Sequence, residues 1–167
     1  FVVYPYKLST SAELPVFALL GLLAAPVGVC FTLTLHGVSG FWERLRVPFA
    51  LRLLPAMGAV AIIGIWNADV MGLGYDVISE TLQGLIPGVG LLLLLLVGKI
   101  ITTALTVGSG GSGGIFAPSL FMGATLGGAF GAGVLLIHPV PQFSVATCAV
   151  IGMAAMVGGG TGAVMTA

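Results

Sequence analysis

The chain has 167 residues, of which 58% are hydrophobic and 6% are charged, and its net charge at pH 7 is zero. Soluble domains carry about 25% charged residues, and disordered chains need polar residues that are scarce here, so both classes are excluded. We therefore predict an all-α integral membrane protein, and the neutral charge argues against a nucleic-acid partner.

The first predicted span is the uncharged run Leu14–Leu35, which is long enough to cross a hydrocarbon core of about 30 Å. Residues 10–13 fit a helix-capping box. Pro26 is expected to kink the span, and His36–Gly37 is expected to end it at the membrane interface.

The segment Phe41–Arg52 carries three arginines and a tryptophan, a pattern that predicts an interfacial loop on the cytoplasmic side. The first span would then run from outside to inside. Cys30 and Cys148 both lie in apolar runs, so we interpret them as buried small hydrophobes without a disulfide or metal role.

A shorter apolar run, Leu53–Ala68, is followed by a predicted turn at residues 69–74 and a short helix over Tyr75–Leu82. Asp76 and Glu80 are four residues apart and would share one face of that helix. Such carboxylates could serve acid–base or cation chemistry, but an exposed interfacial face is the favoured interpretation.

The next span is Pro87–Val107, and Lys99 is its single charge. Lysine inside a membrane span either has a functional role or extends to the interface, and both hypotheses stay open here. A further span is predicted over Ile115–Ile137. Its glycines recur every fourth residue, which predicts close helix packing through Gly123, Gly127 and Gly131.

Residues 138–141 contain two prolines and predict a turn. The run Val145–Val157 is too short to span a membrane, and we expect Gly158–Gly160 to break it before another helix begins near Thr161. Short, interrupted spans of unequal length are typical of transporters that bind their substrate near the middle of the membrane.

The glycine-rich segment 108–114 matches two enzyme motifs. GxGxxG is satisfied, but a dinucleotide site also needs a preceding strand and a later acidic residue, and both are missing. GxSxG places Ser112 as the nucleophile of an intramembrane serine hydrolase, with His138 as its base. A helix of about 33 Å would separate the two side chains, which weakens that hypothesis.

A third interpretation uses the backbone. Pro118 fits a first helical turn, so a helix is predicted to begin around Gly114 to Phe116. Its first N–H groups have no acceptor within the helix, and the helix dipole adds roughly half a positive charge there. This predicts an anion site without cationic side chains; the alternative is a purely structural glycine turn.

The stretch Gly114–Pro118 resembles the GxFxP motif of the CLC family of chloride channels and chloride/proton exchangers. Residues 72–78, 99–103, 123–131 and 160–164 are also similar to that family, in its order and spacing. The resemblance covers nearly the whole chain. It implies broken, tilted helices, with residues 1–167 forming the second of two inverted-topology halves, truncated at both ends.

The resemblance also implies the site. The backbone N–H groups of Ile115 and Phe116 would contact a central chloride, and those of Phe116 and Ala117 would face an outer site. Lys99 would add positive potential on the inner side. Three further residues would shape the site: Gly113, Gly114 and Pro118. We expect no catalytic residue, enzymatic activity, metal or cofactor, with chloride or a similar small anion as the transported ligand.

The resemblance further implies a multi-pass membrane protein, in the inner membrane if it is bacterial, that forms a homodimer with one pathway per subunit. It would be a voltage-gated-type chloride channel or a chloride/proton antiporter. The family's central serine, gating glutamate and anion-binding tyrosine belong to motifs not found in this chain. Channel and exchanger, or chloride, nitrate and fluoride, are therefore not separated by the sequence.

Overall fold

The computed structural model describes residues 13–45, 47–85, 88–137 and 144–165, and all regular structure within these ranges is helical. The prediction of an all-α membrane fold is therefore confirmed. Three of the helices, α1, α4 and α5, are long and apolar enough to cross a membrane. In chain order the elements are α1 (Glu13–Leu45), α2 (Phe49–Trp66), the 3-10 helix η1 (Ala68–Val70), α3 (Tyr75–Leu82), α4 (Val89–Gly108), α5 (Phe116–Ile137) and α6 (Val145–Met165).

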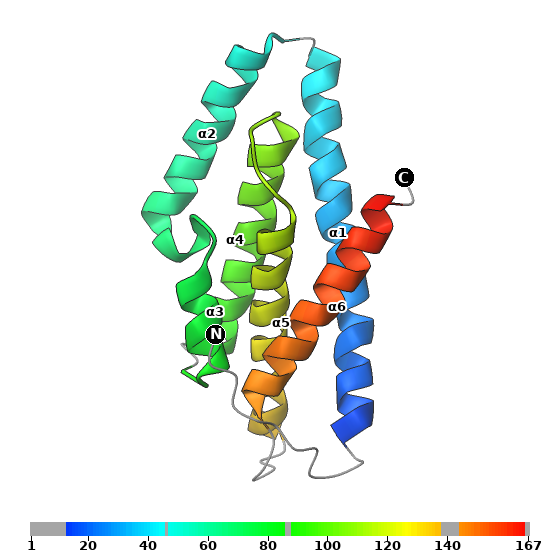
Figure 1. Ribbon diagram of the computed structural model, residues 1–167. Helices are drawn as coiled ribbons and strands as arrows, with labels where there is room; N and C mark the ends of the chain where they lie inside the picture. Colours follow the sequence, from blue (N-terminus) through cyan, green and yellow to red (C-terminus); the bar gives the residue numbers. More distant parts are fainter. Residues whose placement is uncertain (1–12, 46, 86–87, 138–143, 166–167) are drawn as a thin grey trace.

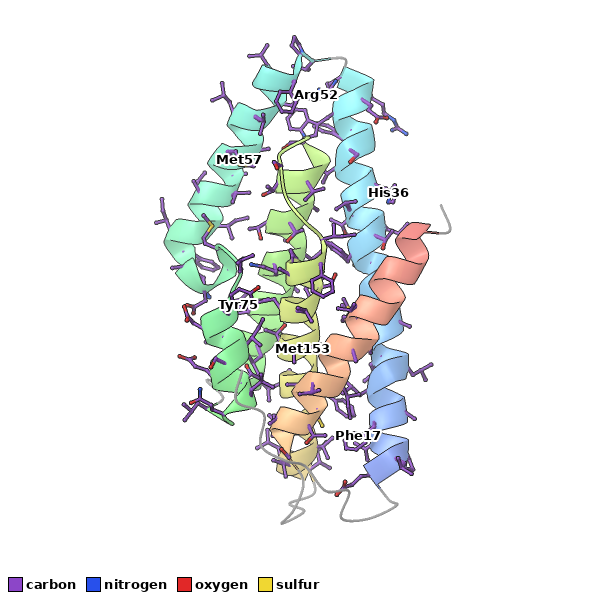
Figure 2. All side chains as sticks on the ribbon, in the orientation of Figure 1. Phe17, His36, Arg52, Met57, Tyr75 and Met153 are labelled. Carbon is purple, nitrogen blue, oxygen red and sulfur yellow. The ribbon has the colours of Figure 1, made fainter. Side chains whose placement is uncertain are left out.

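The helices are arranged around α4 and α5 (Figure 1). α1 and α2 meet at one end of the molecule and diverge toward the other, α4 lies between them, and α6 crosses obliquely over α1. Arg52 lies at the end where α1 and α2 meet (Figure 2), and its Nε donates a hydrogen bond of 2.6 Å to the Val47 carbonyl oxygen. The predicted capping box and the turn at 138–141 fall largely or wholly outside the described residues.

The first helix is longer than predicted. It passes through His36 and Gly37 without ending, so the predicted interfacial end is wrong. The His36 ring donates from Nδ1 to the Thr32 carbonyl oxygen at 2.8 Å, so this polar side chain is satisfied by its own helix. A glycine within a helix costs only about 1 kcal/mol, which a long apolar helix tolerates. The predicted loop Phe41–Arg52 is also largely helical, because α1 continues to Leu45 and α2 begins at Phe49.

The short helix α3 has the predicted bounds, Tyr75–Leu82. Its apolar face is buried through Val77, Ile78 and Leu82. Asp76 and Glu80 are exposed on the opposite side, so the interpretation as an exposed helix face is confirmed.

The α5–α6 contact is the most extensive in the bundle, and the predicted glycine packing is confirmed there. A Cβ atom at Gly127 would overlap the Cys148 carbonyl group, and one at Gly131 would lie 3.2 Å from the Val145 Cα atom. Gly123 meets the backbone of α6 at Met153 in the same way. The two helix backbones can approach this closely only because these positions lack side chains.

The last helix contradicts two expectations. α6 continues through Gly158–Gly160 to Met165, so the predicted break and the separate helix near Thr161 are both wrong. Glycine permits a break but does not force one, and no proline lies between Gly158 and Met165. Cys148 is buried as predicted, whereas Cys30 is exposed on the outer side of α1.

Candidate anion site at the start of α5

The connection between α4 and α5 begins with a glycine-dependent helix end. The Gly111 amide donates to the Thr106 carbonyl oxygen and the Gly110 amide donates to the Val107 carbonyl oxygen, both at 2.9 Å. These two bonds form a Schellman motif, in which the residue after the helix adopts positive φ. Gly110 fulfils that requirement with φ of +92°. The last carbonyl groups of α4 are thus satisfied while the chain reverses direction.

The α1–α2 end of the molecule packs against this connection. A Cβ atom at Gly108 would lie 2.8 Å from Val38 Cγ1, and one at Gly110 would lie 2.9 Å from the Phe49 ring. After Gly111 the chain runs back along α4, so that α5 begins beside the middle of α4 rather than at its end (Figure 1). The start of α5 therefore lies partway along α4, where Gly114 and Phe116 are exposed.

The first turn of α5 presents backbone donors. The Ser119 amide donates to the Ile115 carbonyl oxygen at 3.0 Å, which closes the first helical turn. Pro118 has no N–H group and is tolerated in that turn. Within the described residues, no acceptor is found for the N–H groups of Ile115, Phe116 and Ala117. The predicted helix start is confirmed, and these three donors lie at its positive end.

A cavity of about 490 Å³ lies at this helix start. Four groups of residues line it. They are Gly113, Gly114, Phe116, Ala117 and Pro118 from the start of α5; Lys99, Thr102, Thr103, Thr106 and Val107 from α4; Val70, Met71, Gly72 and Leu73 from the α2–α3 connection; and Val60 from α2. The cavity brings together the predicted site residues except Ile115, whose side chain packs instead in an apolar cluster with residues of α1, α5 and α6.

Two of the threonine hydroxyls that line the cavity, those of Thr102 and Thr106, already donate hydrogen bonds within α4. Thr102 Oγ1 donates to the Gly98 carbonyl oxygen at 2.9 Å, and Thr106 Oγ1 donates to the Thr102 carbonyl oxygen at 2.8 Å. A hydroxyl has one proton to donate, so these threonines face the cavity with oxygen lone pairs. These two hydroxyls are therefore not free to donate to an anion.

Lys99 does not extend to the interface, so that alternative is wrong. Its side chain is 2% exposed. The Nζ atom donates to the Val70 carbonyl oxygen at 3.0 Å and to the Gly72 carbonyl oxygen at 2.6 Å. The same atom lies 4.7 Å from the centroid of the Phe121 ring, in cation–π geometry.

Ser112 is exposed in the α4–α5 connection. No hydrogen bond joins it to a histidine or carboxylate in the part of the chain that the structure describes, and His138 lies outside that part. The geometry of a nucleophile with its base is thus not found for the hydrolase hypothesis.

Sequence reasoning missed the wall formed by residues 70–73 and the hydroxyl face of α4. The hydroxyl face of α4 had a signal in the sequence, an i, i+3, i+4, i+7 pattern that places Lys99, Thr102, Thr103 and Thr106 on one helix face. The wall at residues 70–73 had no such signal, because contacts between segments far apart in sequence leave no local pattern.

Comparison with known proteins decides the family. The family described as voltage gated chloride channel matches residues 2–167. The chain belongs to this family. It is 34% identical over 139 residues to the chloride channel protein CLC-f of Arabidopsis thaliana. The aligned region covers 78% of this chain and 18% of that protein.

Two bacterial relatives are also similar. The H(+)/Cl(-) exchange transporter ClcA of Cronobacter sakazakii is 30% identical over 144 residues, covering 84% of this chain and 31% of the transporter. The putative chloride channel protein ClcB-like of Ralstonia nicotianae is 36% identical over 138 residues, covering 82% of this chain and 32% of that protein. This CLC chain therefore spans about a third or less of these relatives, and it is part of a multi-pass integral membrane fold.

Proposed function

We propose that the chain forms one wall of an anion pathway in a chloride channel or chloride/proton antiporter. The single observation that carries the proposal is the set of unpaired N–H groups at Ile115, Phe116 and Ala117, at a helix start beside a cavity. Oriented N–H groups and the helix dipole favour negative charge without a fixed counter-charge. An anion held this way is released more readily than one paired with lysine or arginine, as conduction requires.

The relatives support chloride as the ion. They are named as a chloride channel protein and an H(+)/Cl(-) exchange transporter, and the chain corresponds to a part of each. We propose that this chain is the second of two inverted-topology halves, that the first half completes the pathway, and that the full protein is a homodimer. Gly113, Gly114 and Pro118 shape the site in this proposal.

The proposal is tested on the full-length protein in liposomes, with chloride efflux and external pH recorded together. Efflux is expected. Coupled proton uptake identifies an antiporter, and efflux without proton movement identifies a channel. Absence of flux for chloride and other small anions, from folded protein, would overturn the proposal.

A matched pair of variants tests the backbone donors. Phe116→Ala removes the ring and keeps the N–H group, whereas Phe116→Pro removes both. Proline is well accommodated at the first helical position, so the second variant is expected to fold. Losing a donor to a charged acceptor costs about 1.5–3 kcal/mol, so Phe116→Pro is expected to transport chloride at least about tenfold more slowly than Phe116→Ala. Equal flux in the two variants would contradict a role for this N–H group.

Ser112→Ala addresses the remaining alternative. It is expected to leave chloride flux unchanged, because the serine side chain is exposed and outside the residues that line the cavity. Covalent labelling of the wild-type protein by a fluorophosphonate, lost in Ser112→Ala, would instead support the hydrolase.

A further inference from the structure

Lys99 connects three elements at the cavity. It belongs to α4, its Nζ donates to two carbonyl groups of the α2–α3 connection, and it lies over the Phe121 ring of α5. An ammonium group has three donors, and two of them are used on Val70 and Gly72. The side chain therefore cross-links the α2–α3 connection to α4 across a sequence separation of 27 and 29 residues.

The α2–α3 connection has little regular structure of its own. Apart from η1, residues 67–74 form turns, and Gly72 and Gly74 have positive φ of 62° and 71°. A Cβ atom at Gly98 of α4 would lie 3.0 Å from Val70 Cγ2, so the connection also lies closely against α4. Gly74 in turn lies directly against the Phe121 ring, the ring that Lys99 covers.

This connection supplies the wall of the cavity contributed by Val70, Met71, Gly72 and Leu73. Met71 and Leu73 are 41% and 53% exposed, and they lie in the same cavity as Phe116. Their positions depend on the carbonyl groups on either side of Met71, since Val70 and Gly72 are the two residues that Lys99 holds. A shift of this short segment would change the width of the cavity beside the α5 donors.

We propose that Lys99 is a positioning residue that fixes the α2–α3 connection as one wall of the anion pathway, and that its hydrogen bonds matter more than its charge. This inference rests on the proposed function and names a determinant of its selectivity. It differs from the electrostatic role expected from the sequence, in which the positive charge alone would raise the local anion concentration. A substitution that keeps hydrogen-bond donors at position 99 but removes the positive charge distinguishes the two roles.

The experiment uses the full-length protein with three substitutions at this position. Lys99→Gln keeps N–H donors without the charge, Lys99→Met keeps the side-chain length without donors or charge, and Lys99→Arg keeps both. Val97→Ala is the matched control, because Val97 is on the same helix, 52% exposed, and absent from the cavity lining. Two quantities are measured: amide hydrogen exchange in residues 67–74, and the nitrate-to-chloride flux ratio in liposomes.

For Lys99→Met we expect exchange in residues 67–74 to rise at least about tenfold, the size expected when hydrogen bonds to a charged donor are lost. The nitrate-to-chloride ratio is expected to shift with it. Lys99→Gln is expected to restore both quantities toward the wild-type values, and Lys99→Arg and Val97→Ala to retain them. Equal flux changes in Lys99→Gln and Lys99→Met, with unchanged exchange in both, would overturn the inference in favour of the charge.

A second variant keeps the inference testable if Lys99→Met does not fold. Leu73→Ala trims the proposed wall without touching Lys99, and it is expected to shift the nitrate-to-chloride ratio while leaving hydrogen exchange in α4 unchanged. An unchanged nitrate-to-chloride ratio in Leu73→Ala would contradict the proposal that residues 70–73 form a wall of the pathway. If the wild-type protein transports no anion at all, the proposed function fails, whereas hydrogen exchange in Lys99→Gln and Lys99→Met still decides whether Lys99 holds the connection.

Discussion

Two glycine-rich segments, the α4–α5 connection and the glycines along α5, use the same residue for different physical purposes. In the connection, Gly110 has φ of +92° and allows the chain to reverse after α4. In α5, Gly123, Gly127 and Gly131 are ordinary helical residues whose missing side chains admit the backbone of α6. The first segment depends on backbone conformation, and the second depends on the distance between two backbones.

This difference predicts different consequences of substitution. A side chain in the packed stripe, which consists of Gly123, Gly127 and Gly131, must separate α5 from α6, because atoms opposite include backbone atoms that cannot rotate away. A side chain at Gly110 in the connection meets the flexible Phe49 side chain, and its conformational penalty is confined to that one residue. We therefore expect the stripe to determine stability and the connection to determine the geometry of the anion site.

The largest effect is expected for Gly127→Val. A Cβ atom there would overlap the Cys148 carbonyl group and would lie 2.8 Å from the Ala149 Cα atom. Overpacking of a closely packed core costs about 1–3 kcal/mol or more, and here the backbone itself must move, so we expect a loss of about 3 kcal/mol in the free energy of unfolding. Thermal unfolding of the purified protein in detergent measures it.

The control for this substitution lies on the same helix. A Cβ atom at Gly133 would have no neighbour within 4 Å, so Gly133→Ala is expected to leave the unfolding temperature unchanged or to raise it. Equal losses in Gly127→Val and Gly133→Ala would contradict a specific role for the contact with α6, since helix propensity alone favours alanine over glycine.

A smaller loss is expected for Gly110→Ala. Left-handed backbone costs an alanine about 1–2 kcal/mol, and its Cβ atom would lie 2.9 Å from the Phe49 ring. The double variant Gly110→Ala with Phe49→Ala separates the two contributions, since it removes the ring contact and keeps the conformational strain. We expect the double variant to regain only part of the stability, as measured by chemical unfolding. Full recovery would mean that φ at this position contributes nothing.

The comparison also explains where the sequence was a reliable guide. α3 follows from the predicted turn before it, and the bounds of α4 and α5 follow closely from apolar run lengths and from Pro118, which are local signals. Glycine was misinterpreted at Gly37 and at Gly158–Gly160, where the helix continues. Before Gly110 the helix does end, because the amides of Gly110 and Gly111 bond back to α4 and complete a Schellman motif. Glycine permits a helix end, and the hydrogen bonds that follow decide it.

The candidate site also has one part that local sequence signals predicted and one part that they did not. Free N–H groups at the start of this helix were predicted, because a helix start determines which N–H groups lack acceptors, and the resemblance to the CLC family implied residues 115–117. Its opposite wall at residues 70–73 was not predicted, because it reaches the site through contacts of Lys99 with segments distant in sequence. Local patterns carry no record of such contacts.

Gly114→Ala tests whether a glycine in the α4–α5 connection affects the anion site without affecting stability. A Cβ atom at Gly114 would meet nothing within 4 Å, and the residue lines the cavity. Stability is expected to change by less than about 0.5 kcal/mol, as for surface substitutions. A methyl group beside the α5 donors is expected to lower chloride flux about fivefold, which corresponds to roughly 1 kcal/mol. Liposome flux and thermal unfolding of the same preparation test both parts, and a destabilised protein with normal flux would contradict the assignment.

The smallest effect, and of opposite sign, is expected for Gly158→Ala. Gly158 lies within the continuous part of α6, and a Cβ atom there would have no neighbour within 4 Å. Replacing a mid-helix glycine by alanine stabilises by about 0.5–1 kcal/mol, so a small rise in unfolding temperature is expected. Gly152→Ala on the same helix is the matched opposite, because its Cβ atom would overlap the Gly123 carbonyl oxygen. If both variants were destabilised, α6 would have a close neighbour at Gly158 in the full-length protein, and this glycine would belong with the packed stripe of α5.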